Sequence, residues 1–307
     1  MKRIVITGAT GFIGRALCKD LCKDYKVVGL SRDIRRASGL IGDFAEIFEW
    51  DGRTTGTWIR QADGAFAVIN LAGDNLASGK WNRYKKAGIL HSRLDATRAI
   101  IAAIKQVDNK PSVVIQSSAV GYYGPSGLQK LNEQSPPGKG FLSDVCQKVE
   151  FCTEQMENLD VRLVVIRTGV VIGSGGGALL KIARPFKFFL GGHPGSGRQW
   201  FSWISLKDQV AAIRFLLENE DQQGVFNLTA PEPVTMKKFC KALGRVLHRP
   251  SLFFVPGFIL RLRFGEMADE IILSGQRVVP ERLLDAGFKF EHLEIKQALN
   301  DIFRRGD

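Results

Sequence analysis

Short β-branched runs alternate with longer helical patterns along the first half of the chain. Residues 2–8, KRIVITG, are typical of a buried strand, and residues 11–24 then place apolar side chains at helical spacing. The clearest later helical stretches lie at 91–107 and 140–157. Since each parallel crossover packs a helix on one face of a sheet, this alternation predicts an α/β fold with a doubly wound parallel sheet. Five further runs are predicted as its strands: 26–31, 46–50, 65–72, 112–118 and 161–167.

The pattern changes after about residue 172. Glycine-rich loops at 173–177 and 191–197 interrupt the alternation. We therefore expect a first domain over 1–172 and a smaller C-terminal α/β lobe over 173–307 that holds a substrate or a partner. In the lobe region the sequence predicts one strand at 225–229, which we expect to return to the first domain's sheet. It also predicts helices at 207–219, 235–247 and 293–303.

The chain is basic, with 43 Lys and Arg against 31 Asp and Glu, a formal charge of +12 over 307 residues. This balance favours an anionic partner, although solvated surface charge is the simpler explanation for most of it. Because no long basic run with interleaved aromatic residues occurs, we do not expect nucleic acid as a partner. Small phosphorylated ligands remain open.

The five cysteines form no CxxC pair and the four histidines are far apart in sequence, so we expect no metal site. An odd number of cysteines, and a strand rather than a signal segment at the start, predict a reduced, cytoplasmic protein. The most apolar stretch, 252–260, is much shorter than the roughly 20 residues that span a bilayer. We therefore do not expect an integral membrane protein.

A glycine-rich turn joins the first predicted strand to the first predicted helix. Glycines there allow a tight turn, a close approach of the backbone to a pyrophosphate and close helix–strand packing, and the helix N-terminus offers free N–H groups. Because the required strand and helix flank the turn, we predict a Rossmann-type dinucleotide site. The residues expected at the cofactor are Thr7, Gly8, Thr10, Gly11, Phe12, Ile13 and Gly14.

The end of the second strand favours NADP(H) over NAD(H). Enzymes that use NAD place an acid there for the ribose hydroxyls, whereas a 2′-phosphate needs cations and hydrogen-bond donors. Here Ser31 and Arg32 end the strand, Arg35 follows on the next turn, and Asp33 stands one position too late for the acid.

Several motifs together resemble the extended short-chain dehydrogenase/reductase superfamily, in its nucleotide-sugar epimerase branch. They are TGATGFIG at 7–14, VINLAG at 68–73, SSAVGYYG at 117–124 and a helix with Lys148. The segments at 73–93, 167–173, 195–204, 227–235 and 275–288 are similar to the YfcH-type epimerase family proteins. That resemblance implies an NADP(H)-binding fold followed by a short C-terminal domain of unknown function, here about 250–298.

The resemblance also implies roles for single residues. The residues after the fourth strand would line the cofactor, namely Asn70, Leu71, Ala72 and Gly73. Ser117 or Ser118 would be the active-site hydroxyl, and Lys148 would bridge the nicotinamide ribose. The family's proton-transferring tyrosine stands four residues before that lysine, where this chain has Asp144. A solvated aspartate is a poor acid at neutral pH, so Tyr122 and Tyr123 are alternative phenols, with aromatic packing as their other interpretation.

The substrate is not defined by the motifs. Nucleotide-sugar members carry an arginine that meets the sugar-nucleotide phosphate, whereas the corresponding stretch here is FSWI at 201–204. A pocket for something less charged is one interpretation, and plain core or surface is the other. The candidate pocket residues are Trp81, Arg93, Arg198 and Trp200.

Two functions from different classes remain open. The first is an NADP(H)-dependent oxidoreductase or epimerase of a small molecule. The second is an NADP(H)-sensing regulator or scaffold that acts on a protein partner, a hypothesis motivated by the missing tyrosine and by a division-related role ascribed in places to the family. A further hypothesis makes residues 252–264 an interaction surface, for a homodimer or for membrane contact.

Overall fold

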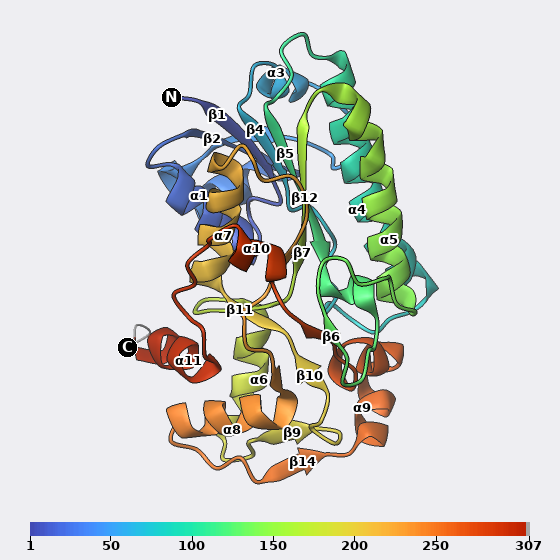
Figure 1. The fold of residues 1–307 in the computed structure, drawn as a ribbon, viewed down its shortest axis with the longest axis vertical. Helices are drawn as coiled ribbons and strands as arrows, with labels where there is room; N and C mark the ends of the chain where they lie inside the picture. Colours follow the sequence, from blue (N-terminus) through green and yellow to red (C-terminus); the bar gives the residue numbers. More distant parts are fainter. Residues whose placement is uncertain (305–307) are drawn as a thin grey trace.

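A seven-stranded parallel sheet forms the centre of the protein (Figure 1), and the computed structural model describes residues 1–304. Its strand order is β12-β7-β5-β4-β1-β2-β3. The strand order reverses at β1, which has β4 on one side and β2 on the other, as in a doubly wound fold. The strands are β1 Arg3–Thr7, β2 Lys26–Ser31, β3 Glu46–Glu49, β4 Ala67–Asn70, β5 Val113–Ala119, β7 Arg162–Thr168 and β12 Gly224–Leu228.

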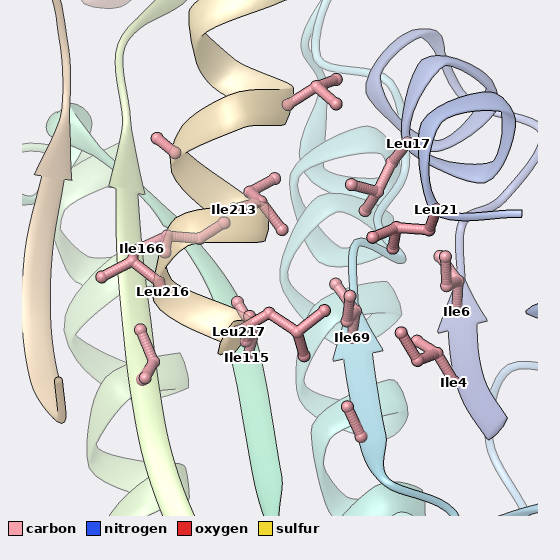
Figure 2. Close-up of a cluster of buried hydrophobic side chains, with 14 of the residues drawn as sticks. Ile4, Ile6, Leu17, Leu21, Ile69, Ile115, Ile166, Ile213, Leu216 and Leu217 are labelled. Atoms are coloured by element: carbon pink, nitrogen blue, oxygen red, sulfur yellow. The ribbon is translucent and has the colours of Figure 1, made fainter. Parts of the chain in front are cut away.

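Helices cover both faces of this sheet. Those packed around it are α1 Phe12–Leu21, α2 Ile34–Ile41, α3 Ile59–Ala62, α4 Arg83–Gln106, α5 Phe141–Thr153 and α7 Leu206–Glu218. Ile4 and Ile6 of β1 point to the α1 and α7 side, where Leu17 and Leu21 of α1 lie nearest to them and Leu217 of α7 lies beside Ile69 and Ile115 (Figure 2). Val5 points the other way, into the cluster beneath α4. Strands buried on both faces explain why the sequence shows continuous apolar runs rather than alternation.

The C-terminal part contributes one strand to the central sheet and builds a lobe of small elements below it (Figure 1). A separate apolar cluster holds the lobe together, with Phe186, Trp203 and Phe239 fully buried. Its elements are β8 Val170–Ile172, α6 Gly177–Lys187, β9 Gly192–Pro194, β10 Trp200–Phe201, β11 Trp203–Ser205, β13 Val234–Thr235, α8 Met236–Val246, β14 Phe253–Val255, α9 Gly257–Phe264 and α11 Ile295–Arg304. The domain boundary at residue 172 stays a prediction.

The remaining elements are short and connect the lobe to the sheet. β6 Lys130–Leu131 pairs with β15 Arg277–Val278, and α10 Glu281–Asp285 packs near β12. Single turns of 3₁₀ or π helix lie at Gly42–Phe44, Val120–Tyr123, Glu154–Leu159 and Ala268–Ile272. No helix within residues 1–304 is long and apolar enough to cross a membrane.

The predicted fold class is confirmed, and the main differences concern helix ends. The helix expected at 91–107 begins at Arg83, because the Asn82 side chain accepts a hydrogen bond from the Lys85 amide and caps it. The helix expected at 140–157 ends at Thr153 and continues as a 3₁₀ turn. The strand expected at 225–229 lies beside β7 at the edge of the central sheet.

Candidate functional site

The turn after β1 has the backbone that a pyrophosphate site needs. Gly8 has φ of 67°, and a Cβ added there would lie 2.6 Å from the Leu71 carbonyl oxygen. A Cβ at Gly14 would lie 2.3 Å from the Gly8 carbonyl oxygen. Both positions therefore accept only glycine without a shift of backbone. The Gly11 amide donates to the Gly8 carbonyl at 2.9 Å and closes the turn.

The N-terminus of α1 is left open towards a ligand. Gly11 is the N-cap residue and offers no side-chain cap, and the first turn of α1 contains no acidic residue. Free N–H groups at a helix N-terminus, together with the helix dipole, favour an anion. The residues present therefore fit the pyrophosphate of a dinucleotide.

The glycine loop at 173–177 lies against the same turn. A Cβ at Gly176 would come within 2.6 Å of the Phe12 ring, and one at Gly177 within 2.9 Å. Because Phe12 is the first residue of α1, this loop packs against the start of that helix. The sequence placed these glycines in a lobe loop, and the structure adds contact with the cofactor site.

A buried hydrogen-bond chain fixes the end of β4 beside the turn. The Thr7 hydroxyl donates to Asn70 Oδ1 at 2.6 Å and accepts from the Leu71 and Ala72 amides at 3.1 and 3.2 Å. Asn70 Nδ2 then donates to Gln116 Oε1 on β5 at 2.8 Å. Thr7 and Asn70 are fully buried. They hold the backbone of 71–73 in place, so their side chains act as supports.

The end of β2 is followed by exposed cations and by an aspartate that already caps a helix. Asp33 is the N-cap of α2, and its Oδ1 accepts from the Arg36 amide at 3.0 Å. Ser31 Oγ bonds with the Asp33 backbone. Arg32 and Arg35 are exposed, and neither side chain has a hydrogen-bond or ion-pair partner within residues 1–304. Both guanidinium groups are therefore available to a phosphate.

Helix α5 turns different side chains toward β5 than the family pattern implies. Asp144 and Lys148 lie on its exposed side, whereas Cys146 and Glu150 face the end of β5. Lys148 is two residues from Cys146, about 200° around the helix, and so points away from it. The structure thus does not bring Lys148 to Ser118, and a thiol and a carboxylate take the places expected for the phenol and the ammonium.

Ser118 belongs to a buried ionic network. Its hydroxyl donates to Glu150 Oε1 at 2.5 Å. The same carboxylate accepts two hydrogen bonds from Arg167, from Nε at 3.0 Å and from an Nη at 2.7 Å, and Arg167 is almost fully buried. A bidentate pair of this kind is geometrically specific, and removing one partner would leave a buried charge. Ser117 Oγ has no partner within residues 1–304.

The two tyrosines meet this network in different ways. Tyr123 is buried, and its hydroxyl accepts from Arg167 at 3.0 Å and donates to Asn227 Oδ1 at 2.8 Å. Burial raises the pKa of Tyr123 to about 12. The Tyr122 ring stacks on the Arg167 guanidinium at 3.4 Å, and its hydroxyl has no partner within residues 1–304. Tyr122 is thus the phenol that is free to meet a ligand.

Cys146 is unsuited to act as an acid or a nucleophile. Burial, together with the negative charge of Glu150, raises the pKa of its thiol to about 11. Its Sγ lies 3.7 Å from the Ala119 carbonyl oxygen. At neutral pH the group is a neutral, weakly polar thiol.

Two of the predicted substrate residues, Arg93 and Trp81, lie at α4 and α5 and are turned into the protein. Arg93 packs against Gly73, donates to the Ile89 carbonyl at 2.9 Å and to the Asp74 carbonyl at 3.3 Å, and burial lowers its pKa. Trp81 is buried in a small apolar cluster, with its ring 5.3 Å from that of Phe141.

The other two predicted substrate residues lie elsewhere. Trp200 lines a cavity of about 480 Å³ near β15, and none of the residues lining that cavity belongs to the Ser118 network. The guanidinium of Arg277 lies 4.7 Å from the Trp200 ring, and Trp200 Nε1 is buried without a hydrogen-bond partner among residues 1–304. Arg198 is exposed on the loop before β10. The structure therefore does not bring these four residues together in one pocket.

One group in the described part of the chain has side chains that could ligate a metal. Glu291, His292 and Asp301 offer ligand atoms within 4.8 Å of one another. Glu291 is ion-paired with Lys207, and His292 Nδ1 bonds with Ser205 Oγ at 3.0 Å. These side chains already have protein partners, and they tie α11 to the sheet.

Sequence reasoning missed Cys146, Glu150 and Arg167. The usable signal was the helical period, because Cys146 and Glu150 are four residues apart, the same spacing as the family's tyrosine and lysine. Choosing between that pair and Asp144 with Lys148 required knowing which face of α5 is buried. Arg167 is near the end of a strand whose other residues are mostly apolar. No sequence pattern therefore indicates that its side chain is buried or that it forms an ion pair with Glu150.

The parallel sheet with its strand reversal at β1, and the glycine turn at the start of α1, together define a dinucleotide-binding protein of the Rossmann class. The chain belongs to the NAD dependent epimerase/dehydratase family, whose model matches residues 4–229. A domain of unknown function, DUF1731, matches residues 255–302.

Relatives extend over nearly the whole chain. The chain is 39% identical to a chloroplastic SDR39U1 homolog of the epimerase family from Arabidopsis thaliana, covering 98% of this chain and 86% of that protein. It is 37% identical to an epimerase family protein of Mycobacterium bovis, covering 96% of each. The crystal structure of human epimerase family protein SDR39U1 with NADPH superposes with a TM-score of 0.88 at 32% identity, covering 98% of this chain and 99% of that one.

Proposed function

We propose that the protein binds NADP(H) in preference to NAD(H) and catalyses an NADP(H)-dependent oxidation, reduction or epimerisation of a small molecule. The observation that carries the cofactor preference is at the end of β2, where Asp33 is used as a helix cap while Arg32 and Arg35 have no side-chain partner in the described part of the chain. The NADPH in the human relative's structure supports the same choice.

In this proposal each part of the site has one task. The amides at the start of α1 hold the pyrophosphate, and the backbone of 71–73 supports the nucleotide's other side. A bound nicotinamide supplies hydride chemistry. Ser118 donates its hydroxyl proton to Glu150 and accepts a hydrogen bond from a substrate hydroxyl, and Tyr122 donates or accepts the proton that moves in the reaction. The Arg167 guanidinium, 3.4 Å from the centre of the Tyr122 ring, holds that ring beside the Ser118 network.

A single-turnover measurement tests the catalytic part. Enzyme loaded with NADPH is mixed with a panel of small carbonyl compounds, enzyme loaded with NADP+ is mixed with a panel of alcohols and sugar nucleotides, and nicotinamide absorbance is followed. We expect the bound nicotinamide to be oxidised or reduced with at least one class, and a rate lowered about 100-fold in Tyr122→Phe with unchanged cofactor affinity, in line with the usual contribution of a positioned acid or base. No change in absorbance across the panel would contradict the enzyme proposal.

The second candidate function is an NADP(H)-sensing regulator that acts on a protein partner. The observation that favours it is on α5, where Asp144 and Lys148 face outward and a neutral thiol stands beside Ser118. Ser118→Ala distinguishes the two functions. If the protein is an enzyme, the Ser118→Ala gene should fail to restore the normal phenotype to cells that lack the wild-type gene. If it is a sensor, the variant gene should restore that phenotype as long as the variant still binds NADPH.

A further inference from the structure

The positive charge of the protein is concentrated in two segments of the lobe. Residues 173–206 and 233–265 contain eleven of the 43 Lys and Arg residues and none of the 31 Asp and Glu residues. Almost all of the formal +12 therefore originates there, and the rest of the chain is close to neutral. These segments include α6, β9, α8, β14 and α9, which gather at the end of the long axis opposite α3 (Figure 1).

The same end of the molecule exposes a cluster of large apolar side chains, which we call the apolar end. It consists of residues 188–190, residues 252–255 and the outer side of α9. β14 pairs with β9, and the Phe253 amide donates to the Gly191 carbonyl at 3.1 Å, so the first two segments are adjacent. A cavity of about 600 Å³ lined by Phe254, Pro256 and Arg261 continues the surface to α9.

Helix α9 is apolar on two opposite sides. Leu260 and Phe264 pack inward, whereas Phe258 and Leu262 form the outer side and are 68% and 80% exposed. In a surface helix of a soluble protein the side away from the core is normally polar, so an apolar outer side points to a further contact. Leu252, before β14, is 84% exposed. Contiguous apolar surface of this kind marks an interaction site rather than scattered surface residues.

Cations surround the apolar end. Lys187, Arg249 and Arg263 adjoin its three parts, and the Arg249 guanidinium lies 4.5 Å from the Phe189 ring. The nearest acids in sequence are engaged, since Glu266 pairs with Lys86 and Asp269 with Arg261. The surface is therefore both apolar and positive.

We infer that the apolar end docks on the surface of an anionic lipid bilayer. Phe258, Leu262 and Leu252 would enter the interface, and the surrounding cations would meet lipid phosphates, the arrangement typical of peripheral membrane segments. Charge decides against a second copy of the chain, because two apolar ends in contact would bring the same cations against each other. The inference goes beyond the proposed function and does not depend on catalysis.

Co-sedimentation with vesicles tests the inference. The full chain is mixed with vesicles of phosphatidylcholine alone and of equal parts phosphatidylcholine and phosphatidylglycerol. We expect it to sediment only with the anionic vesicles and to be released by salt. Arg263→Glu should lower the partition coefficient at least fivefold, the effect of about one cation at a charged surface. Leu262→Ser should lower it by a similar factor.

Matched variants serve as controls. Leu128 is 81% exposed outside the apolar end, so Leu128→Ser should sediment like the wild type, as should Lys105→Glu. All variants should keep their NADPH affinity, which shows that they are folded. A wild type that stays in the supernatant with both vesicles overturns the inference. Gel filtration supplies the other contrary result, a dimer that Leu262→Ser dissociates without any vesicle binding.

Discussion

Arg32 and Asp33 are neighbours with opposite charges, and the structure gives them different tasks. Asp33 caps α2 with its side chain, while the Arg32 guanidinium has no partner in the described chain. At an NAD site the acid would hold the ribose hydroxyls, but here it already accepts a backbone hydrogen bond. The proposed preference for NADP(H) thus depends on local helix capping as well as on charge.

Replacing Arg32 tests the phosphate contact. Arg32→Ala should weaken NADPH binding roughly 10- to 100-fold, the value of a charge-assisted hydrogen bond, and leave NADH binding almost unchanged. Isothermal titration calorimetry with both cofactors measures this. Lys105→Ala, an exposed cation on α4, is the control. Equal losses for both cofactors would place Arg32 away from the 2′-phosphate.

Tyr122 and Tyr123 offer a second comparison between neighbours. Tyr123→Phe removes a hydroxyl that bonds Arg167 and Asn227, so it should lower the free energy of unfolding by about 1–3 kcal/mol. Tyr122→Phe should leave stability within about 0.5 kcal/mol, since it removes no hydrogen bond. Urea unfolding of both variants checks this. A larger loss for Tyr122→Phe would mean that its hydroxyl has a structural partner.

At the scale of elements, the C-terminal segment supports the helix that carries Glu150. Both carboxylate oxygens of Glu270 accept hydrogen bonds from the first turn of α5, from the Phe141 amide at 3.1 Å and the Leu142 amide at 3.2 Å. Glu270 lies in the π turn that follows α9. The DUF1731 region therefore caps a helix of the dinucleotide-binding sheet, and its loss would disturb the orientation of α5.

Glu270→Ala should lower the free energy of unfolding by about 1 kcal/mol, because it leaves the N-terminus of α5 uncapped. Glu266→Ala, which removes a surface ion pair with Lys86, should cost less than about 0.5 kcal/mol. Denaturant unfolding of the two variants gives the comparison. Equal effects would contradict a specific capping role for Glu270.

The positions of helices and strands were easier to predict from the sequence than the side of each helix that packs inward. The strands of the central sheet and the glycine turn follow from β-branched runs and from glycine spacing, which are local signals. The inward face of α5 depends on how the helix packs against β5, and the amphipathic pattern around Cys146 did not decide it. The Glu150–Arg167 pair joins a helix to a strand, so no local pattern contains it.

For the whole molecule, buried thiols predict a loss of stability at high pH. The pKa of Cys146 is raised from 9.0 to about 11, and those of Cys18 and Cys240 to about 12, in each case chiefly by burial. The unfolded chain therefore releases these protons first. The contribution of the neutral thiols to the free energy of unfolding is complete below pH 9, the pKa of a thiol in the unfolded chain. It is lost as the pH rises through the raised pKa values of the folded protein.

Cys146→Ala isolates one thiol in this effect. Between about pH 8 and pH 11 the wild type should lose about 2 kcal/mol more stability than the variant, since the variant has no thiol there to ionise. Thermal unfolding across this range measures the difference. Parallel pH profiles for the two proteins would show that the thiol titrates normally in the folded state.

Calorimetric titration of the wild-type protein with NADPH and NADH shows whether the glycine turn, the open N-terminus of α1 and the cations after β2 form one NADP(H) site. We expect NADPH to bind at least about tenfold more tightly than NADH, with salt weakening NADPH more than NADH. Equal affinities, tighter binding of NADH, or no binding of either would contradict it.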